Sequence, residues 1–174
     1  AEAIAILDRT IGLWPGKNYL FRTRIRVALS HGRYQDGLRL ITDPSMDLPA
    51  EERAAWSAAL AALMSNDPAR RDAAAGALER VTREPSRNDP FPVMALGALG
   101  RNAEAIAVAE RLIQRLGPSV MRVLFEPPLA QARHEPAFGK LVERLGVASY
   151  WRKSGHKPDF CEAADAPDLC RSLG

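Results

Sequence analysis

Apolar residues recur at intervals of three and four along most of the chain, with polar residues between them. This spacing is typical of amphipathic helices. Alanine, the best helix former, is abundant, and the β-branched runs that strands prefer are missing. The pattern and its Pro and Gly interruptions predict an all-α chain with helices over residues 1–14, 19–31, 34–43, 50–66, 68–83, 93–99 and 103–116.

The predicted helices repeat with a period near 34 residues. Four prolines mark the units, at spacings of 34, 36 and 33 residues: Pro15, Pro49, Pro85 and Pro118. A small residue stands 12 positions before each of the first three: Ala3, Gly37 and Ala73. A unit of this length is one antiparallel helix pair, which buries its apolar face only by stacking on its neighbours. We therefore expect an α-solenoid over residues 1–118, with a concave surface and no natural catalytic cleft.

The pattern changes in residues 119–174, where Pro and Gly punctuate short apolar segments. We expect this carboxy-terminal part to cap the last helix pair, because a terminal unit must cover the last apolar face. Six of its residues should then be largely buried: Phe125, Leu129, Phe138, Leu141, Leu145 and Trp151. Trp14 and Trp56 lie on predicted apolar helix faces, so we expect core packing for them as well.

The chain begins with Ala1 and not with Met. Residues 1–14 read as the second helix of a pair whose first helix is missing. We therefore expect the chain to be part of a longer protein, with a further domain before Ala1.

Two segments, 32–38 (GRYQDGL) and 100–106 (GRNAEAI), follow the same order. Each has a small residue at a turn, then a short polar stretch, and then small and aliphatic residues at the start of a predicted helix. They resemble the tetratricopeptide (TPR) pattern, which implies a TPR-like superhelix. Residues 150–161, followed by Cys170 and Arg171, are similar to the carboxy-terminal end of bacterial TPR proteins fused to winged-helix transcription regulators or nucleotide cyclases. This resemblance implies a protein-interaction module of a bacterial signalling or transcription-regulatory protein, which binds a peptide or a protein domain on its concave face.

The alternative is a sensor domain that binds a small molecule or an envelope signal between repeats. The binding surface distinguishes the two hypotheses. An open face with charged and polar residues would favour a peptide, whereas a closed apolar pocket with a few polar groups would favour a small molecule.

In TPR proteins the first helix of each pair lines the concave face. Counting from Gly37, this register places four residues of the helix at 19–31 on the groove side: Tyr19, Arg22, Arg26 and Leu29. Their spacing of three or four residues makes one helical stripe. Two arginines beside an aromatic residue suit an acidic peptide, because a guanidinium group binds a carboxylate through two parallel hydrogen bonds.

The net charge of +3 comes from scattered arginines and not from a basic block. We therefore expect no direct binding of nucleic acid by this segment. The longest nearly uncharged apolar stretch, residues 54–64, is too short to span a bilayer, so we expect no membrane insertion.

The sequence contains no recognisable catalytic motif. Its three histidines, His31, His134 and His156, lie at predicted turns and pair with no Ser or Cys at a known spacing. We expect neither enzymatic activity nor a cofactor.

Cys161 and Cys170 are the two cysteines of the chain. They close a short loop, and both a disulfide and two free thiols fit this spacing. A disulfide would indicate the periplasm, whereas free thiols would indicate the cytoplasm. A zinc site that adds His156 lacks both a CxxC pair and a fourth ligand, so we expect no metal.

Overall fold

The structure, a computed structural model, describes residues 2–14, 17–84 and 88–173. These residues form helices and no β-strand, so the predicted all-α class is confirmed. The α-helices are α1 (Glu2–Leu13), α2 (Asn18–Ser30), α3 (Tyr34–Ile41), α4 (Ala50–Leu63), α5 (Pro68–Arg83), α6 (Phe91–Ala98), α7 (Asn102–Leu116), α8 (Pro136–Arg144) and α9 (Val147–Ser154). The 3₁₀ helices are η1 (Pro118–Phe125), η2 (Pro127–Leu129), η3 (Gln131–His134), η4 (Asp159–Cys161) and η5 (Asp168–Leu173).

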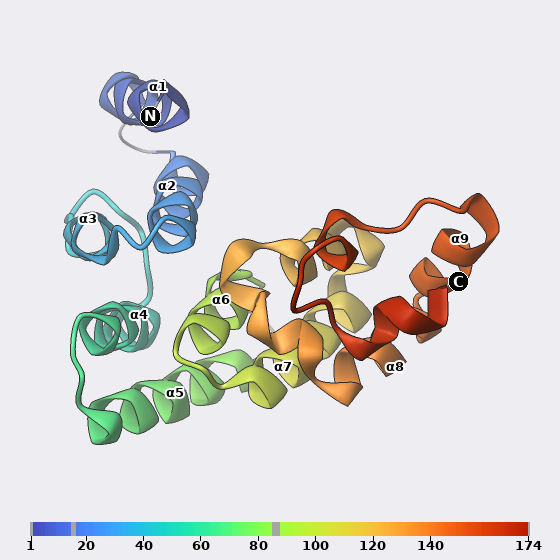
Figure 1. The fold of residues 1–174 in the computed structure, drawn as a ribbon. Coiled ribbons are helices and arrows are strands. Elements are labelled where there is room, and N and C mark those ends of the chain that lie inside the picture. The colour runs from blue at the N-terminus through green and yellow to red at the C-terminus, as the bar shows by residue number, and fades with distance from the viewer. Residues whose placement is uncertain (1, 15–16, 85–87, 174) are drawn as a thin grey trace.

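Consecutive helices pack as pairs: α2 with α3, α4 with α5, and α6 with α7 (Figure 1). The second helices of these pairs begin at Tyr34, Pro68 and Asn102, which are 34 residues apart. The period seen in the sequence therefore appears as a repeat of helix pairs. The marker residues Pro15 and Pro85 lie outside the described residues.

The first and third pairs turn in the same way. Gly32 and Gly100 have positive φ angles of 67° and 79°, a conformation that glycine adopts without the strain other residues incur. The amide of the next residue then donates to the carbonyl five residues earlier, from Arg33 to Ala28 and from Arg101 to Leu96. This hydrogen bond is characteristic of a glycine-terminated helix.

The middle pair departs from this register. Gly37 and Ala105 are each the fourth residue of their helix, and both are buried. Ala73, which the repeat placed with them, is the sixth residue of α5 and is exposed, while Ala74 is buried. Here Asp67 caps the helix by accepting backbone N–H groups, and this cap sets a different start from the glycine turns.

The helix pairs are packed more closely than a linear array requires. In such an array each unit contacts its neighbours. Yet α6, from the third pair, contacts α2 of the first pair as well as α4 and α5 of the second. The regular TPR-like superhelix therefore remains a prediction.

Helix α6 lies at the centre of the packing. All residues from Phe91 to Gly97 are buried, and the ring of Phe91 stacks on Trp56 of α4 with centroids 4.3 Å apart. A Cβ atom on Gly97 would lie 2.5 Å from the carbonyl oxygen of Pro128 in η2. Because no Cβ atom contacts another atom at such a distance, the absence of a side chain allows η2 to pack directly on α6.

In the carboxy-terminal part, η1, η3 and α8 contact α7, and η2 contacts α6. Leu129, Phe138, Leu141 and Trp151 are buried. The prediction was wrong for Phe125, which is 36% exposed because it ends η1 at the edge of an aromatic cluster, and for Leu145, which is only partly buried after the end of α8.

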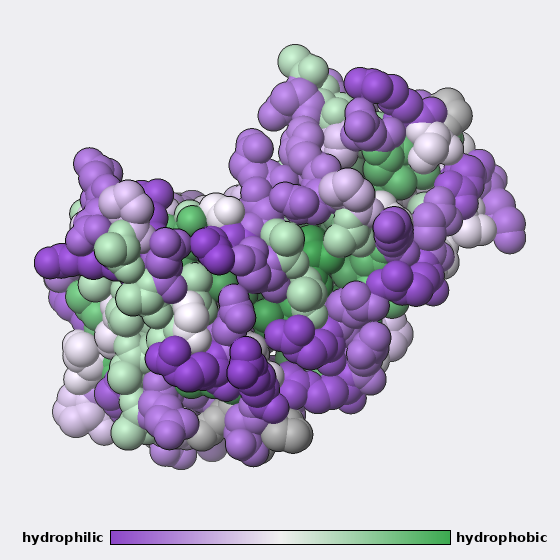
Figure 2. Space-filling view, turned by 90° about the horizontal axis from the view of Figure 1, so that it is seen from below, coloured by the Kyte–Doolittle hydropathy of each residue, from purple (hydrophilic) through white to green (hydrophobic). Residues whose placement is uncertain are grey.

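Trp14 is 53% exposed, so its predicted place in the core was wrong. Helix α1 packs mainly on α2, and Trp14 follows its last residue, beyond this contact. An ion pair holds the two helices together, with Arg24 Nε 2.7 Å from Asp8 Oδ1. Leu13, Tyr19 and Tyr150 are exposed as well. Figure 2 shows a face on which hydrophilic residues predominate and hydrophobic residues lie in patches between them.

We expect Gly97→Ala to destabilise the protein. Alanine favours a helix over glycine by about 1 kcal/mol, but the clash with Pro128 should cost more, since overpacking typically costs about 1–3 kcal/mol. Gly139→Ala in α8 is the matched control, because a Cβ there meets no atom within 4 Å. Thermal unfolding should show a lower midpoint for Gly97→Ala and a slightly higher one for Gly139→Ala. A midpoint raised by both substitutions would contradict the close packing of α6 on η2.

Cys161 and Cys170 form a disulfide with Cα atoms 5.4 Å apart. Closing this short loop should stabilise the carboxy-terminal part by about 2.5 kcal/mol on the loop-entropy estimate. We therefore expect Cys161→Ser with Cys170→Ser, and also chemical reduction, to lower the thermal midpoint. Alkylation followed by mass spectrometry counts the free thiols with and without prior reduction. Two alkylated cysteines in the protein that was not reduced would contradict the disulfide.

Candidate functional site

A cleft of about 490 Å³ lies between α2, α6 and η1. Its lining comes from four parts of the chain: Thr23, Arg26, Val27, Ser30 and His31; Asn88, Pro90 and Met94; Ser119, Val120, Arg122 and Val123; Glu126 and Pro127. Both α2 and α6 are the first helices of their pairs.

The cleft combines an apolar floor with a polar rim. Met94 and Val123 are buried, whereas Arg122, Ser119 and Asn88 are exposed, so the cleft is open to solvent. An open rim of polar side chains around apolar surface can hold a chain that carries both kinds of group.

Two arginines of the lining give the cleft a positive character. Arg26 belongs to α2 and Arg122 to η1, and neither forms an ion pair with any residue that the structure describes. Arg26 donates a hydrogen bond of 3.2 Å to the hydroxyl of Thr23, whose own hydroxyl donates to the carbonyl of Tyr19. One carboxylate, that of Glu126, also lines the cleft, so the arginines outnumber the acids.

The sequence of α2 determines which of its residues line the cleft. Phe21, Ile25 and Leu29 are buried and define the face that packs on the core. Thr23 and Ser30 lie on the opposite face, given 100° of rotation for each residue. Arg26 lies beside them and therefore lines the same cleft.

The predicted binding stripe does not form one surface. Arg26 lines the cleft, but Tyr19, 65% exposed, lies outside its lining. Leu29 is 2% exposed and belongs to the core, so its assignment to the binding surface was wrong. The stripe was counted from Gly37, whereas the apolar positions of α2 itself would have indicated the accessible face.

Arg22, the remaining residue of the stripe, binds within the protein. Its guanidinium group lies 3.0 Å from a carboxylate oxygen of Asp89 and 3.5 Å from one of Glu52, and 5.2 Å from the ring centroid of Trp56. These contacts join α2 to α4 and to the residue just before Pro90 and α6. Arg22 therefore holds three parts of the protein together, and its contact with a partner stays a prediction.

Several cleft residues were missed, and η1 supplies the clearest case. Gly117, with a φ of 81°, ends α7, and Pro118 then begins the 3₁₀ helix that brings Arg122 to the cleft. Nothing in the sequence near Arg122 indicates that it lies in the same cleft as Arg26. The pairing follows from how η1 packs on α7, which is a tertiary contact.

The histidines are separate from one another. His31 lines the cleft, with Nδ1 2.8 Å from the carbonyl oxygen of Val27, while His134 and His156 are exposed in the carboxy-terminal part. No group of three or more His, Cys, Asp or Glu residues in the described ranges could hold a metal ion. None of the described helices is long and apolar enough to cross a membrane.

Comparison with known proteins found no match to a family model, to a curated protein or to a solved structure. The TPR resemblance and the bacterial signalling setting thus remain predictions.

Arg22→Met should destabilise the protein by about 2–4 kcal/mol, somewhat less than the roughly 3–5 kcal/mol typical of breaking a fully buried pair. The reason is that Asp89 and Glu52 lose a cation in a position where their side chains are 10% and 5% exposed. Arg26→Met is the matched control, expected to stay within about 0.5 kcal/mol of the parent protein. Urea denaturation measures both. Equal losses of stability in the two variants would contradict the expectation that Arg22 stabilises the fold more than Arg26 does.

Proposed function

We propose that the protein is a non-catalytic protein-interaction module and that the cleft between α2, α6 and η1 binds an acidic, partly apolar segment of a partner protein. The observation that carries this proposal is the pair of arginines, Arg26 and Arg122, which border an apolar floor without a carboxylate partner among the described residues. Its setting, a larger bacterial signalling or transcription-regulatory protein, rests on the resemblance to TPR proteins.

The chemistry of the lining supports a peptide as the ligand. Guanidinium groups bind carboxylates through charge-assisted hydrogen bonds, which contribute roughly twice as much as neutral ones. Val27, Val120 and Pro127 offer apolar surface for the side chains that alternate with acidic ones. The hydroxyl and amide groups of Ser30, Ser119 and Asn88 could pair with the backbone of an extended segment.

A second candidate, a small-molecule sensor, follows from the volume of the cleft. Its 490 Å³ lies within the range of about 300–1,000 Å³ in which small-molecule pockets fall. Such pockets are usually enclosed and mainly apolar. The exposed rim and the many polar side chains of this cleft therefore favour a peptide.

We expect a phage-displayed library of random peptides, selected on the protein, to yield sequences in which Asp or Glu neighbours apolar residues. The strongest peptide, carrying a fluorophore, should then bind at least tenfold more weakly to the double variant Arg26→Ala, Arg122→Ala, because each charged hydrogen bond contributes about 1.5–3 kcal/mol. Fluorescence anisotropy measures the affinity.

The matched control is Arg80→Ala with Arg111→Ala, which removes two exposed arginines that do not line the cleft. This control should bind the peptide like the parent protein. Selected peptides without acidic residues, or equal affinity for both double variants, would contradict the proposal. If no peptide is enriched and a small molecule from a metabolite collection raises the melting point of the parent but not of the cleft variant, the sensor function is favoured.

A further inference from the structure

A second cavity of about 490 Å³ lies in the carboxy-terminal part, away from the cleft. Six residues line it, and we call it the aromatic–arginine pocket: Phe125, Arg133, Trp151, Pro158, Asp159 and Phe160. None of these residues lines the cleft described above. The pocket is therefore a separate candidate site, independent of the proposed function.

Three of the six lining residues carry aromatic rings. The rings of Phe125 and Phe160 are close to parallel, at 15°, with centroids 6.4 Å apart. Trp151 stands nearly perpendicular to both, with centroid distances of 6.1 and 6.0 Å. This arrangement offers ring faces and edges together, which are the surfaces that attract another aromatic group.

Arg133 is the cation among the six described lining residues. Its guanidinium carbon lies 5.1 Å from the ring centroid of Phe160, and Nη1 lies 3.4 Å from the carbonyl oxygen of Leu124. Burial lowers the pKa of Arg133, which means that its charged form is poorly solvated.

This charge has no acidic partner within the described ranges of the chain. Asp159 lines the same pocket but is exposed and makes no ion pair with Arg133. A partly buried cation without an anion carries a desolvation cost. A carboxylate that entered the pocket would offset this cost, because guanidinium and carboxylate fit each other in a bidentate pair.

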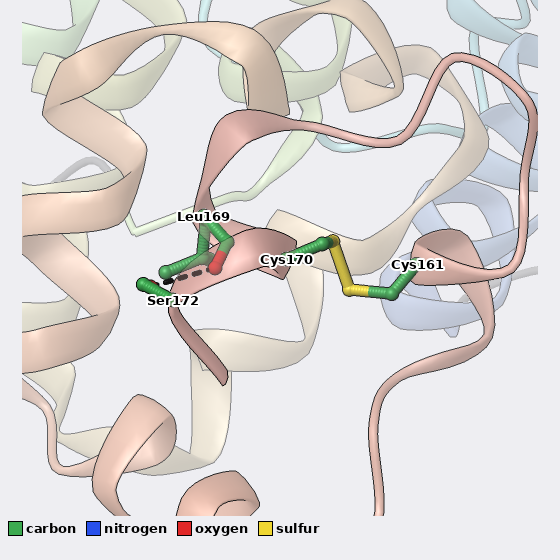
Figure 3. The surroundings of a disulfide bond; sticks show 4 residues. All are labelled: Cys161, Leu169, Cys170 and Ser172. Atoms are coloured by element: carbon green, nitrogen blue, oxygen red, sulfur yellow. Dashed lines mark hydrogen bonds between the residues drawn. A yellow bond between two sulfur atoms is a disulfide. The ribbon is translucent and has the colours of Figure 1, made fainter. Parts of the chain in front are cut away.

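The disulfide lies directly beside Phe160 in the chain. Phe160 directly precedes Cys161, whose sulfur is bonded to Cys170 of η5 (Figure 3). In η5 the hydroxyl of Ser172 donates to the carbonyl of Leu169, and Leu173 is buried. The backbone hydrogen bonds described for residues 158–170, such as Cys161 N–H to the Pro158 carbonyl, are all local, and the bridge joins η4 to η5 across the loop between them.

From these observations we infer that the aromatic–arginine pocket binds an aromatic carboxylate, with the ring against Phe125 and Trp151 and the carboxylate on Arg133, and that the Cys161–Cys170 disulfide maintains the pocket. Two sources share this chemistry, a free aromatic acid and the carboxy-terminal aromatic residue of a peptide.

The test compares each acid with its neutral counterpart on the oxidised protein by calorimetric titration. The probes are indole-3-acetate against indole-3-acetamide, and a peptide ending in Trp with a free carboxylate against the same peptide amidated. We expect each acid to bind at least tenfold more tightly than its amide. The stronger of the two acids identifies the source.

Arg133→Gln should reduce the affinity for the acid to that for the amide. Phe160→Leu should reduce the affinity for both the acid and the amide, because it removes an aromatic ring of the pocket while keeping apolar volume. Circular dichroism and a cooperative melt establish that each variant is folded. The cleft variant Arg26→Ala, Arg122→Ala should bind the acids like the parent protein, so that failure at one site is distinguished from failure at the other.

Reduction of the disulfide should weaken binding of the acid at least tenfold at a temperature where the protein remains folded. Equal affinity for acid and amide, no binding of either acid at millimolar concentration, or an unchanged affinity in folded Arg133→Gln would overturn the inference and leave Arg133 as a packing residue. Unchanged affinity after reduction would overturn the role of the disulfide.

Discussion

The burial of α6 among helices from all three pairs is the constraint on which the rest of the structure depends. Phe91 stacks on Trp56, and Arg22 binds Asp89 two residues before α6 begins. These contacts bring α2 and α4 onto the same helix. Because Gly97 has no side chain, η2 packs directly on α6. The carboxy-terminal part is thereby fixed to α6 as well. The cleft forms where α2 and α6 meet η1, so its shape follows from this packing.

The helices could be predicted because their signals are local. Asp67 and Pro68 occupy the positions that begin a helix, and the structure has the cap there. Gly32 and Gly100 end helices because glycine adopts a positive φ without strain, which is a property of that single residue. The 34-residue spacing of the second helices follows from these signals. Ala73 shows, however, that an equal distance from a marker proline does not place a residue at the same position of its helix.

The cleft could be predicted only in part, because tertiary contacts decide its lining. Arg26 was assigned correctly to an accessible face, but Arg122 is 96 residues away in the sequence and no local pattern relates them. Leu29 was assigned to the binding surface because the stripe was counted from Gly37, a residue outside α2. The apolar positions of a helix give its orientation more directly than a repeat count does, because burial of those positions is what fixes the helix on the core.

The 3₁₀ segments after α7 are what allow a short stretch of chain to border two cavities. Pro118, Pro127 and Pro128 remove backbone donors that a longer α-helix would need, so the chain advances in brief turns. Phe125 lines the aromatic–arginine pocket and the next residue, Glu126, lines the cleft. A regular helix pair would have covered α7 with one apolar face. The irregular segment covers α7 with η1 and α6 with η2, burying Val123, Leu124 and Leu129, and still leaves side chains of adjacent residues free to face two different sites.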